Sequence, residues 1–109
     1  MAKKTVINKE VKEIAFNFGK AVEKQGIPIK KLIIFGSYAK GKARPESDID
    51  ICVVSPKFGK DSIKELQFLF KIRRKIDSRI EPFPVSWEEY KKTVSPIIFE
   101  IRQFGREIN

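Results

Sequence analysis

Histidine is absent from this 109-residue sequence, and cysteine occurs once, at Cys52. A zinc site built from histidine and cysteine therefore lacks ligands, and an internal disulfide cannot form. The single cysteine favours a reducing, intracellular setting. No apolar run approaches the length of a membrane span, and the first ten residues, MAKKTVINKE, lack the apolar segment of a signal peptide. We therefore expect a cytoplasmic protein with no membrane contact.

Negative charge is also scarce. The 23 lysines and arginines outnumber the 14 aspartates and glutamates, which gives a formal net charge of +9. This balance suits an anionic partner such as a nucleotide or a nucleic acid, although a well-solvated surface explains it equally well. The length predicts one domain, residues 1–109, with one modest core and no second lobe, so a large substrate has to approach from outside.

Two segments show apolar residues at helical spacing. The first follows Asn8, a candidate cap, and ends before Gly26, and the second begins at Asp61. We expect at least Phe70 to lie in the core, whereas the sequence leaves open whether Phe68 belongs to the core or to a partner surface. The apolar positions are Val11, Ile14, Phe18 and Val22 in the first segment, and Ile63, Leu66, Leu69, Ile72 and Ile76 in the second.

Three short segments read as strands. Residues 31–35 are apolar and end at a glycine, and residues 48–54 are rich in isoleucine and valine. Residues 80–85, IEPFPV, carry prolines at alternate positions, which restricts them to a sheet edge, where the strand is free to run antiparallel. Together with the helices, these strands predict an α/β (α+β) fold, a mixed sheet of three or four strands packed by helices in two or three layers.

The end of the chain carries two helix-start signals. Ser86 and Glu89 have the spacing of a capping box for a short helix. Ser95, followed by a proline, predicts a last helix over residues 97–104 that Gly105 ends.

The strand over residues 48–54 opens with two aspartates. Because successive strand residues face opposite ways, Asp48 and Asp50 share one face, with about 7 Å of backbone between them, and Ile49, Ile51 and Val53 share the other. Two like charges at this distance repel each other unless a cation lies between them, and Mg²⁺ prefers such oxygen ligands. The alternative is a pair of aspartates that cap a loop and lie in water.

Upstream, Gly36 and Ser37 follow the first strand. Their backbone amides, the serine hydroxyl and a helix start at YAK could cradle a phosphate. Lys40, Lys42 and Arg44 then place three cations in the connection that returns to the aspartates. The alternative is an ordinary turn of glycine, serine and proline.

The joint pattern is specific. Gly36-Ser37, ten intervening residues and Asp48-Ile49-Asp50-Ile51 resemble the signature of the superfamily that includes DNA polymerase beta and the aminoglycoside nucleotidyltransferases. The fuller string GSYAKGKARPESDIDICV is similar to that of the minimal nucleotidyltransferases of archaea and bacteria. The sequence departs from that pattern at Lys40, where relatives often have arginine, and at residues 106–109, where a final strand is short or missing.

The resemblance implies a role for each matching residue. Gly36 and Ser37 would hold the triphosphate with Lys40 and Arg44, and ATP would be the nucleotide. Asp48 and Asp50 would bind Mg²⁺, two ions being expected with bound nucleotide. A neighbouring strand supplies a third acid in such proteins, for which the candidate is Glu81. The alternatives are Asp77, Glu88 and Glu89, or a Glu81 that merely faces solvent at the edge.

The resemblance also implies an activity. Asp48, Asp50 and Glu81 would support Mg²⁺-dependent nucleotidyl transfer, and Cys52 would be a core residue rather than a nucleophile. Similar minimal proteins are commonly paired with a helical HEPN protein, a toxin ribonuclease, which they neutralise by binding and by AMP transfer to a tyrosine. We therefore expect a protein adenylyltransferase that acts as an antitoxin. A binding-only antitoxin scaffold is the alternative, and a nucleic-acid-binding module is disfavoured because the basic residues show no repeated aromatic interleaving.

Overall fold

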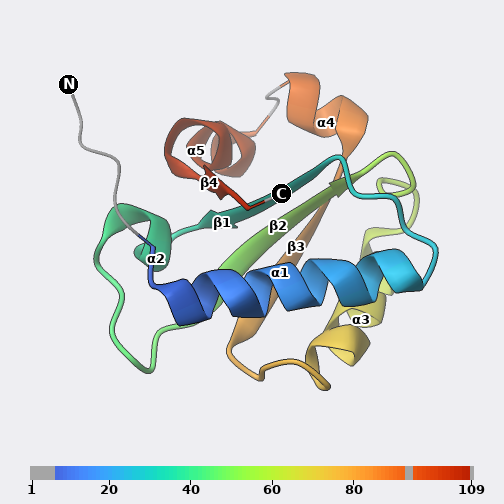
Figure 1. Cartoon of the computed structure of the whole chain (residues 1–109). Helices are drawn as coiled ribbons and strands as arrows, with labels where there is room; N and C mark the ends of the chain where they lie inside the picture. Colours follow the sequence, from blue (N-terminus) through green and yellow to red (C-terminus); the bar gives the residue numbers. More distant parts are fainter. Residues whose placement is uncertain (1–6, 93–94, 109) are drawn as a thin grey trace.

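The fold contains a four-stranded sheet and five helices within residues 7–92 and 95–108, which are the residues that the computed structural model describes. Figure 1 shows the whole chain. In chain order the elements are α1 (Lys9–Lys24), β1 (Lys31–Phe35), α2 (Ser37–Lys40), β2 (Ile49–Ser55), α3 (Ser62–Arg73), β3 (Ile80–Ser86), α4 (Trp87–Lys92), α5 (Pro96–Phe104) and β4 (Arg106–Glu107).

The strand order of the sheet is β3-β2-β1-β4. β1 pairs antiparallel with β2 and with β4, whereas β2 pairs in parallel with β3. The edge position expected for the proline-bearing strand is confirmed, but the antiparallel direction is wrong. α3 connects β2 to β3, and a helical crossover of this kind returns the chain in the same direction.

Helices cover both faces of the sheet (Figure 1). α1 and α3 lie on one side, and α4 and α5 lie on the other. The alternation of β2 divides its side chains between two cores: Ile49, Ile51 and Val53 pack beneath α1 and α3, while Cys52 and Val54 pack against α4 and α5. The molecule therefore has three layers, and the two faces of β2 serve different helices.

The helix starts follow the predicted signals. Asn8 accepts hydrogen bonds from the first-turn amides of α1, and Ser95 caps α5. Ser86 and Glu89 form the capping box reciprocally, each side chain accepting from the other's backbone N–H. β1 has the predicted bounds, and β2 begins one residue late, so that Asp48 lies just before it.

The apolar stripe predicted for the second long helix is partly wrong. Leu69 is fully buried, but Ile63 is 69% exposed. The expectation that Phe70 lies in the core is wrong: it is only partly buried, belongs to neither core, and has the Arg73 guanidinium over its ring at 4.5 Å. Ile76 lies beyond the end of α3, yet it packs against the core beneath α1. Fewer apolar residues of α3 are buried than their helical spacing predicts.

The C-terminal strand is present but short. β4 consists of two residues that pair with Ile33 and Ile34 of β1. Asn109, the last residue of the predicted segment, lies outside the described residues. Among the helices that the structure describes, none is both long and apolar enough to cross a bilayer.

Candidate active site

Asp50 lies in the second position of β2, at the end of the sheet next to α2. In the register of the sheet it stands between Phe35 of β1 and Glu81 of β3. Because side chains alternate along each strand, Asp50 shares a face with Cys52, and Glu81 shares a face with Phe83. Both acids therefore project on the side of the sheet that α4 and α5 cover, as the parallel pairing of β2 and β3 requires.

The electrostatics of Asp50 show which acids gather around it. Its pKa is raised from 3.8 to about 6, chiefly by burial and then by the carboxylates of Asp48, Glu81 and Glu100. We call these four residues the acidic cluster. Asp48 and Glu81 are exposed, whereas Asp50 and Glu100 are half-buried. The predicted acids Asp48 and Glu81 thus both act on the charge of Asp50, and both are exposed to solvent.

Glu100 is the member that the sequence did not reveal. It lies on α5, fifty positions after Asp50, and no motif surrounds it. Glu100 Oε1 lies 3.1 Å from Lys40 Nζ, and the same ammonium lies 5.5 Å from the ring centre of Phe104. Two residues of α5 therefore hold the Lys40 ammonium beside the cluster, and one of them, Glu100, is itself a member of the cluster.

The turn between β1 and α2 lies against Asp50. Gly36 has a φ of +71°, and a Cβ at this position would overlap the Asp50 carboxylate. Only glycine combines this backbone conformation with so close an approach. Ser37 follows as the first residue of α2, where backbone N–H groups have no partner within the helix. The predicted phosphate turn and the acidic cluster are therefore neighbours.

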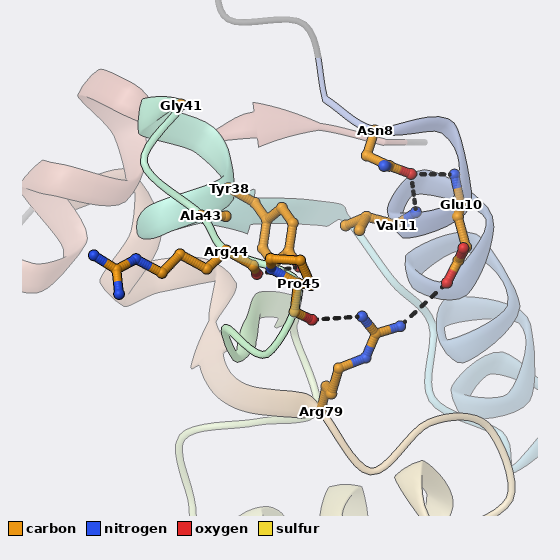
Figure 2. A pocket seen from close by; sticks show the side chains of 9 residues that line it. All are labelled: Asn8, Glu10, Val11, Tyr38, Gly41, Ala43, Arg44, Pro45 and Arg79. Atoms are coloured by element: carbon orange, nitrogen blue, oxygen red, sulfur yellow. Dashed lines mark hydrogen bonds and ion pairs between the residues drawn. The ribbon is translucent and has the colours of Figure 1, made fainter.

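The connection from α2 to β2 is held on the other side of the sheet. A hollow of about 490 Å³ there is lined by residues of α1, α2, this connection and the turn before β3. Figure 2 shows Arg79 in this hollow, donating to the Pro45 carbonyl and to Glu10, each at 3.3 Å, while Arg44 points away from it. The Tyr38 hydroxyl donates to the carbonyl of Arg44. No residue of the acidic cluster lines this hollow. Its hydrogen bonds from Arg79 and Tyr38 hold the connection in place, and the hollow is not part of the candidate site.

The structure also distinguishes Glu81 from its alternatives. Asp77 is engaged by Arg79, whose side-chain hydrogen bond holds the pKa of that carboxyl below its usual value. Glu88 pairs with Lys91, and Glu89 completes the capping box of α4. Of these acids, only Glu81 lies opposite Asp50 in the sheet.

The donor set of the cluster fits a hard cation. All four side chains offer oxygen, which suits Mg²⁺, and the half-buried Asp50 carboxylate feels the like charge of the other three. Within the described residues, however, no three histidine, cysteine, aspartate or glutamate side chains converge closely enough to form a metal site by themselves. Mg²⁺ usually takes only one or two carboxylates together with phosphate oxygens and water, so this looser arrangement still accommodates it.

Cys52 is inert in this setting. It is fully buried on β2, and burial raises the pKa of its thiol to about 12. The thiolate needed for nucleophilic attack is therefore not accessible at neutral pH. The expectation that Cys52 is a core residue is confirmed.

Comparison with known proteins identifies the family. Residues 17–107 match the family model of the nucleotidyltransferase domain. The chain belongs to this family. It is also 31% identical over 81 residues to a protein from Methanocaldococcus jannaschii that is named as a protein adenylyltransferase, a match that covers 73% of this chain and 79% of that one. The predicted enzyme class, a nucleotidyltransferase, is confirmed.

Solved structures share the fold of this nucleotidyltransferase. A toxin–antitoxin crystal structure with AMP-PNP superposes with a TM-score of 0.59 at 23% identity, covering 85% of this chain and 73% of that chain. A protein from Sulfolobus solfataricus, described as a nucleotidyltransferase, gives 0.58 at 20% identity and covers 90% and 82%. A variant of the toxin–antitoxin pair MntA–HpeT gives 0.58 at 21% identity and covers 85% and 73%. The predicted mixed α/β nucleotidyltransferase fold is confirmed.

Proposed function

We propose that this nucleotidyltransferase transfers AMP from ATP to a hydroxyl of a partner protein, a tyrosine of a HEPN-type toxin, and so acts as an antitoxin. The observation that carries the proposal is the acidic cluster around Asp50, packed directly against the turn at Gly36. The adenylyltransferase name of the Methanocaldococcus jannaschii relative supports protein adenylylation. The toxin–antitoxin neighbours support the kind of partner.

The triphosphate would bind at the β1–α2 turn. The backbone amides that follow Gly36 and the hydroxyl of Ser37 would donate to phosphate oxygens. Lys40 has three N–H donors, so it can donate to a phosphate while one donor stays with Glu100. A lysine neutralises phosphate charge but lacks the bidentate geometry of arginine. Arg44, whose side chain is exposed, would add a cation from the connection to β2.

Asp48 and Asp50 would hold Mg²⁺, with Glu81 as the third carboxylate. When bound, the ions would lower the pKa of the acceptor hydroxyl and neutralise charge on the departing pyrophosphate. The acceptor oxygen forms a bond to the α-phosphorus, the bond from that phosphorus to the bridging oxygen breaks, and pyrophosphate leaves. Glu81 is exposed beside Asp50, which suits it to take the proton of the acceptor hydroxyl.

A binding-only antitoxin is the second candidate. It is favoured by one observation, that the carboxylates among the described residues do not converge into a ready metal site. In that case the fold would neutralise the toxin by occupying its surface, and the acidic cluster would contribute charge alone. The two candidates differ in whether the cluster binds a metal–nucleotide complex.

Calorimetry of nucleotide binding tests the proposed site. The wild-type protein should bind ATP far more tightly with Mg²⁺ than without it. Asp48→Asn combined with Asp50→Asn should abolish that difference, because the variant lacks the two carboxylates that would hold the ion. The fold should survive, since removing clustered like charges relieves repulsion.

The matched control replaces two acids outside the cluster, Glu13 and Glu88, by glutamine. It has the same change in net charge and should keep the Mg²⁺ dependence of the wild type. A Mg²⁺ dependence that persists in the aspartate double variant would show that the metal assignment is wrong.

A further inference from the structure

The outer side of α3 and the turn after it carry an unbalanced positive charge. Four exposed cations lie there, and none has an acidic partner among the described residues; they are Lys64, Lys71, Arg74 and Lys75. Among the described residues three lysines pair with an acid, Lys31 with Glu107, Lys40 with Glu100 and Lys91 with Glu88, and all three lie outside α3. This part of the surface therefore carries a local positive charge from four cations.

The acids nearest in sequence are already engaged, and Asp77, which follows the turn after α3, pairs with Arg79 at 3.1 Å. Glu65 accepts the backbone N–H groups of Gly59, Lys60 and Asp61, and Asp61 caps α3 by accepting from the amide of Lys64. Both carboxylates are thus fixed at the N-terminal end of α3. The charged residues in the last two turns of α3 are therefore all cations.

Two hollows adjoin each other along this side of α3. One has a volume of about 430 Å³, and the other, of about 600 Å³, reaches α1 at Ala21 and Gln25. Phe68, Lys71 and Arg74 line both hollows, and no acidic side chain lines either of them. We call the two together the basic trough. Phe68 and Ile72 form its apolar floor, and the cations form its rim.

The aromatic residues of the trough do not offer a platform for bases. Arg73 already covers the ring of Phe70, and Phe68 is partly buried against the core beneath α1. Single-stranded nucleic acids bind to surfaces where successive bases stack on free aromatic faces. An apolar floor bordered by cations instead matches a helix that has an apolar stripe bordered by carboxylates. The twelve residues of α3 give the trough a length of about 18 Å, or some three helical turns.

We propose that the basic trough is a docking site for an acidic amphipathic helix of another protein. The trough lies on the α1 and α3 side of the sheet, whereas the acidic cluster lies on the α4 and α5 side (Figure 1). A helix bound in the trough would leave the cluster accessible. The proposal does not depend on the activity of the cluster, so each can fail without the other.

Fluorescence anisotropy tests the proposal with three labelled probes. The first is a peptide of about 18 residues with leucines at helical spacing and glutamates on both flanks. The second is a scrambled peptide of the same composition, and the third is an oligouridine RNA of equal charge. The amphipathic peptide should bind the full-length protein at least about tenfold more tightly than either other probe at ~100 mM salt.

Charge reversal locates the binding surface. Lys71→Glu combined with Arg74→Glu should weaken binding of the amphipathic peptide about tenfold or more. Lys9→Glu with Lys12→Glu is the matched control at the N-terminal end of α1, and it should bind like the wild type. Lys71→Gln with Arg74→Gln guards against misfolding and should give an intermediate loss, with circular dichroism confirming the fold.

Four results would overturn the proposal. Equal binding of the scrambled peptide would show attraction by charge without recognition of an apolar stripe. Tighter binding of the RNA would identify a nucleic-acid surface instead. An equal loss in the α1 control, or no binding of the amphipathic peptide, would remove the trough as the site.

Discussion

At the scale of single residues, the ionised carboxylate of Asp50 destabilises the folded protein. It lies half-buried beside three other carboxylates, and its pKa of about 6 shows that the folded protein disfavours its charge. A folded-state pKa above the usual 3.8 means that the folded state binds more protons than the unfolded state between these pH values. Stability from this group is therefore present at low pH and lost as pH rises through about 6.

Thermal unfolding without divalent ions tests this cost. Asp50→Asn should melt a few degrees above the wild type at pH 7.5, and the difference should shrink toward zero near pH 4. Asp77→Asn should have the opposite effect, because the hydrogen bond from Arg79 lowers the pKa of the Asp77 carboxyl. Removing this carboxylate should destabilise the protein at neutral pH, and the destabilisation should shrink as pH falls. A difference between Asp50→Asn and wild type that stays constant from pH 4 to 8 would contradict the assignment of the charge cost to Asp50.

At the scale of elements, the β1–α2 turn joins backbone conformation to the site. Gly36→Ala should lower stability by about 1–3 kcal/mol and abolish ATP binding, because it strains a positive φ and displaces the Asp50 carboxylate. Gly26→Ala is the matched control, since Gly26 also has a positive φ of +88° but nothing lies within 4 Å of its added Cβ. Chemical denaturation and calorimetry should show a loss of stability in both variants and a loss of ATP binding in Gly36→Ala alone. Equal ATP binding in the two would separate the turn from the site.

The elements themselves were largely predictable because their signals are local. Capping residues, alternate prolines and the glycine at the end of β1 all act within a few residues, and they predicted α1, the edge position of β3 and the capping box at Ser86. The parallel direction of β3 follows from the α3 crossover once β3 is known to neighbour β2, and no local signal specifies that neighbour. Ile63 continues the apolar spacing of α3, but only the packed structure shows that the sheet does not cover it.

The residues of the candidate site likewise differ in how far the sequence could predict them. Gly36, Asp48 and Asp50 could be proposed from the sequence because their joint pattern resembles the nucleotidyltransferase signature. Glu81 required the assumption that its strand neighbours β2, which the register of β2 and β3 now supports. Glu100 was not predictable, because its approach to Asp50 results from the docking of α5 on the sheet, a contact between distant parts of the chain.

At the scale of the whole molecule, an acidic site and a basic surface lie on opposite sides of the sheet. The acidic cluster lies on the α5 side and the basic trough lies along α3 on the other. Because Asp48 and Glu81 are exposed, an acceptor hydroxyl can reach the cluster from outside. A partner protein would then supply the positioning of its own hydroxyl, from which much of the rate enhancement of a two-substrate reaction arises.

The most direct test of this account is the intact mass of a cognate HEPN-type protein after incubation with this protein and MgATP. We expect a mass increase of one or more AMP units on a tyrosine of the partner, and no increase with Asp48→Asn or without Mg²⁺. Tight binding of a partner that stays unmodified with every nucleoside triphosphate would contradict it and leave the binding-only antitoxin as the function of this fold.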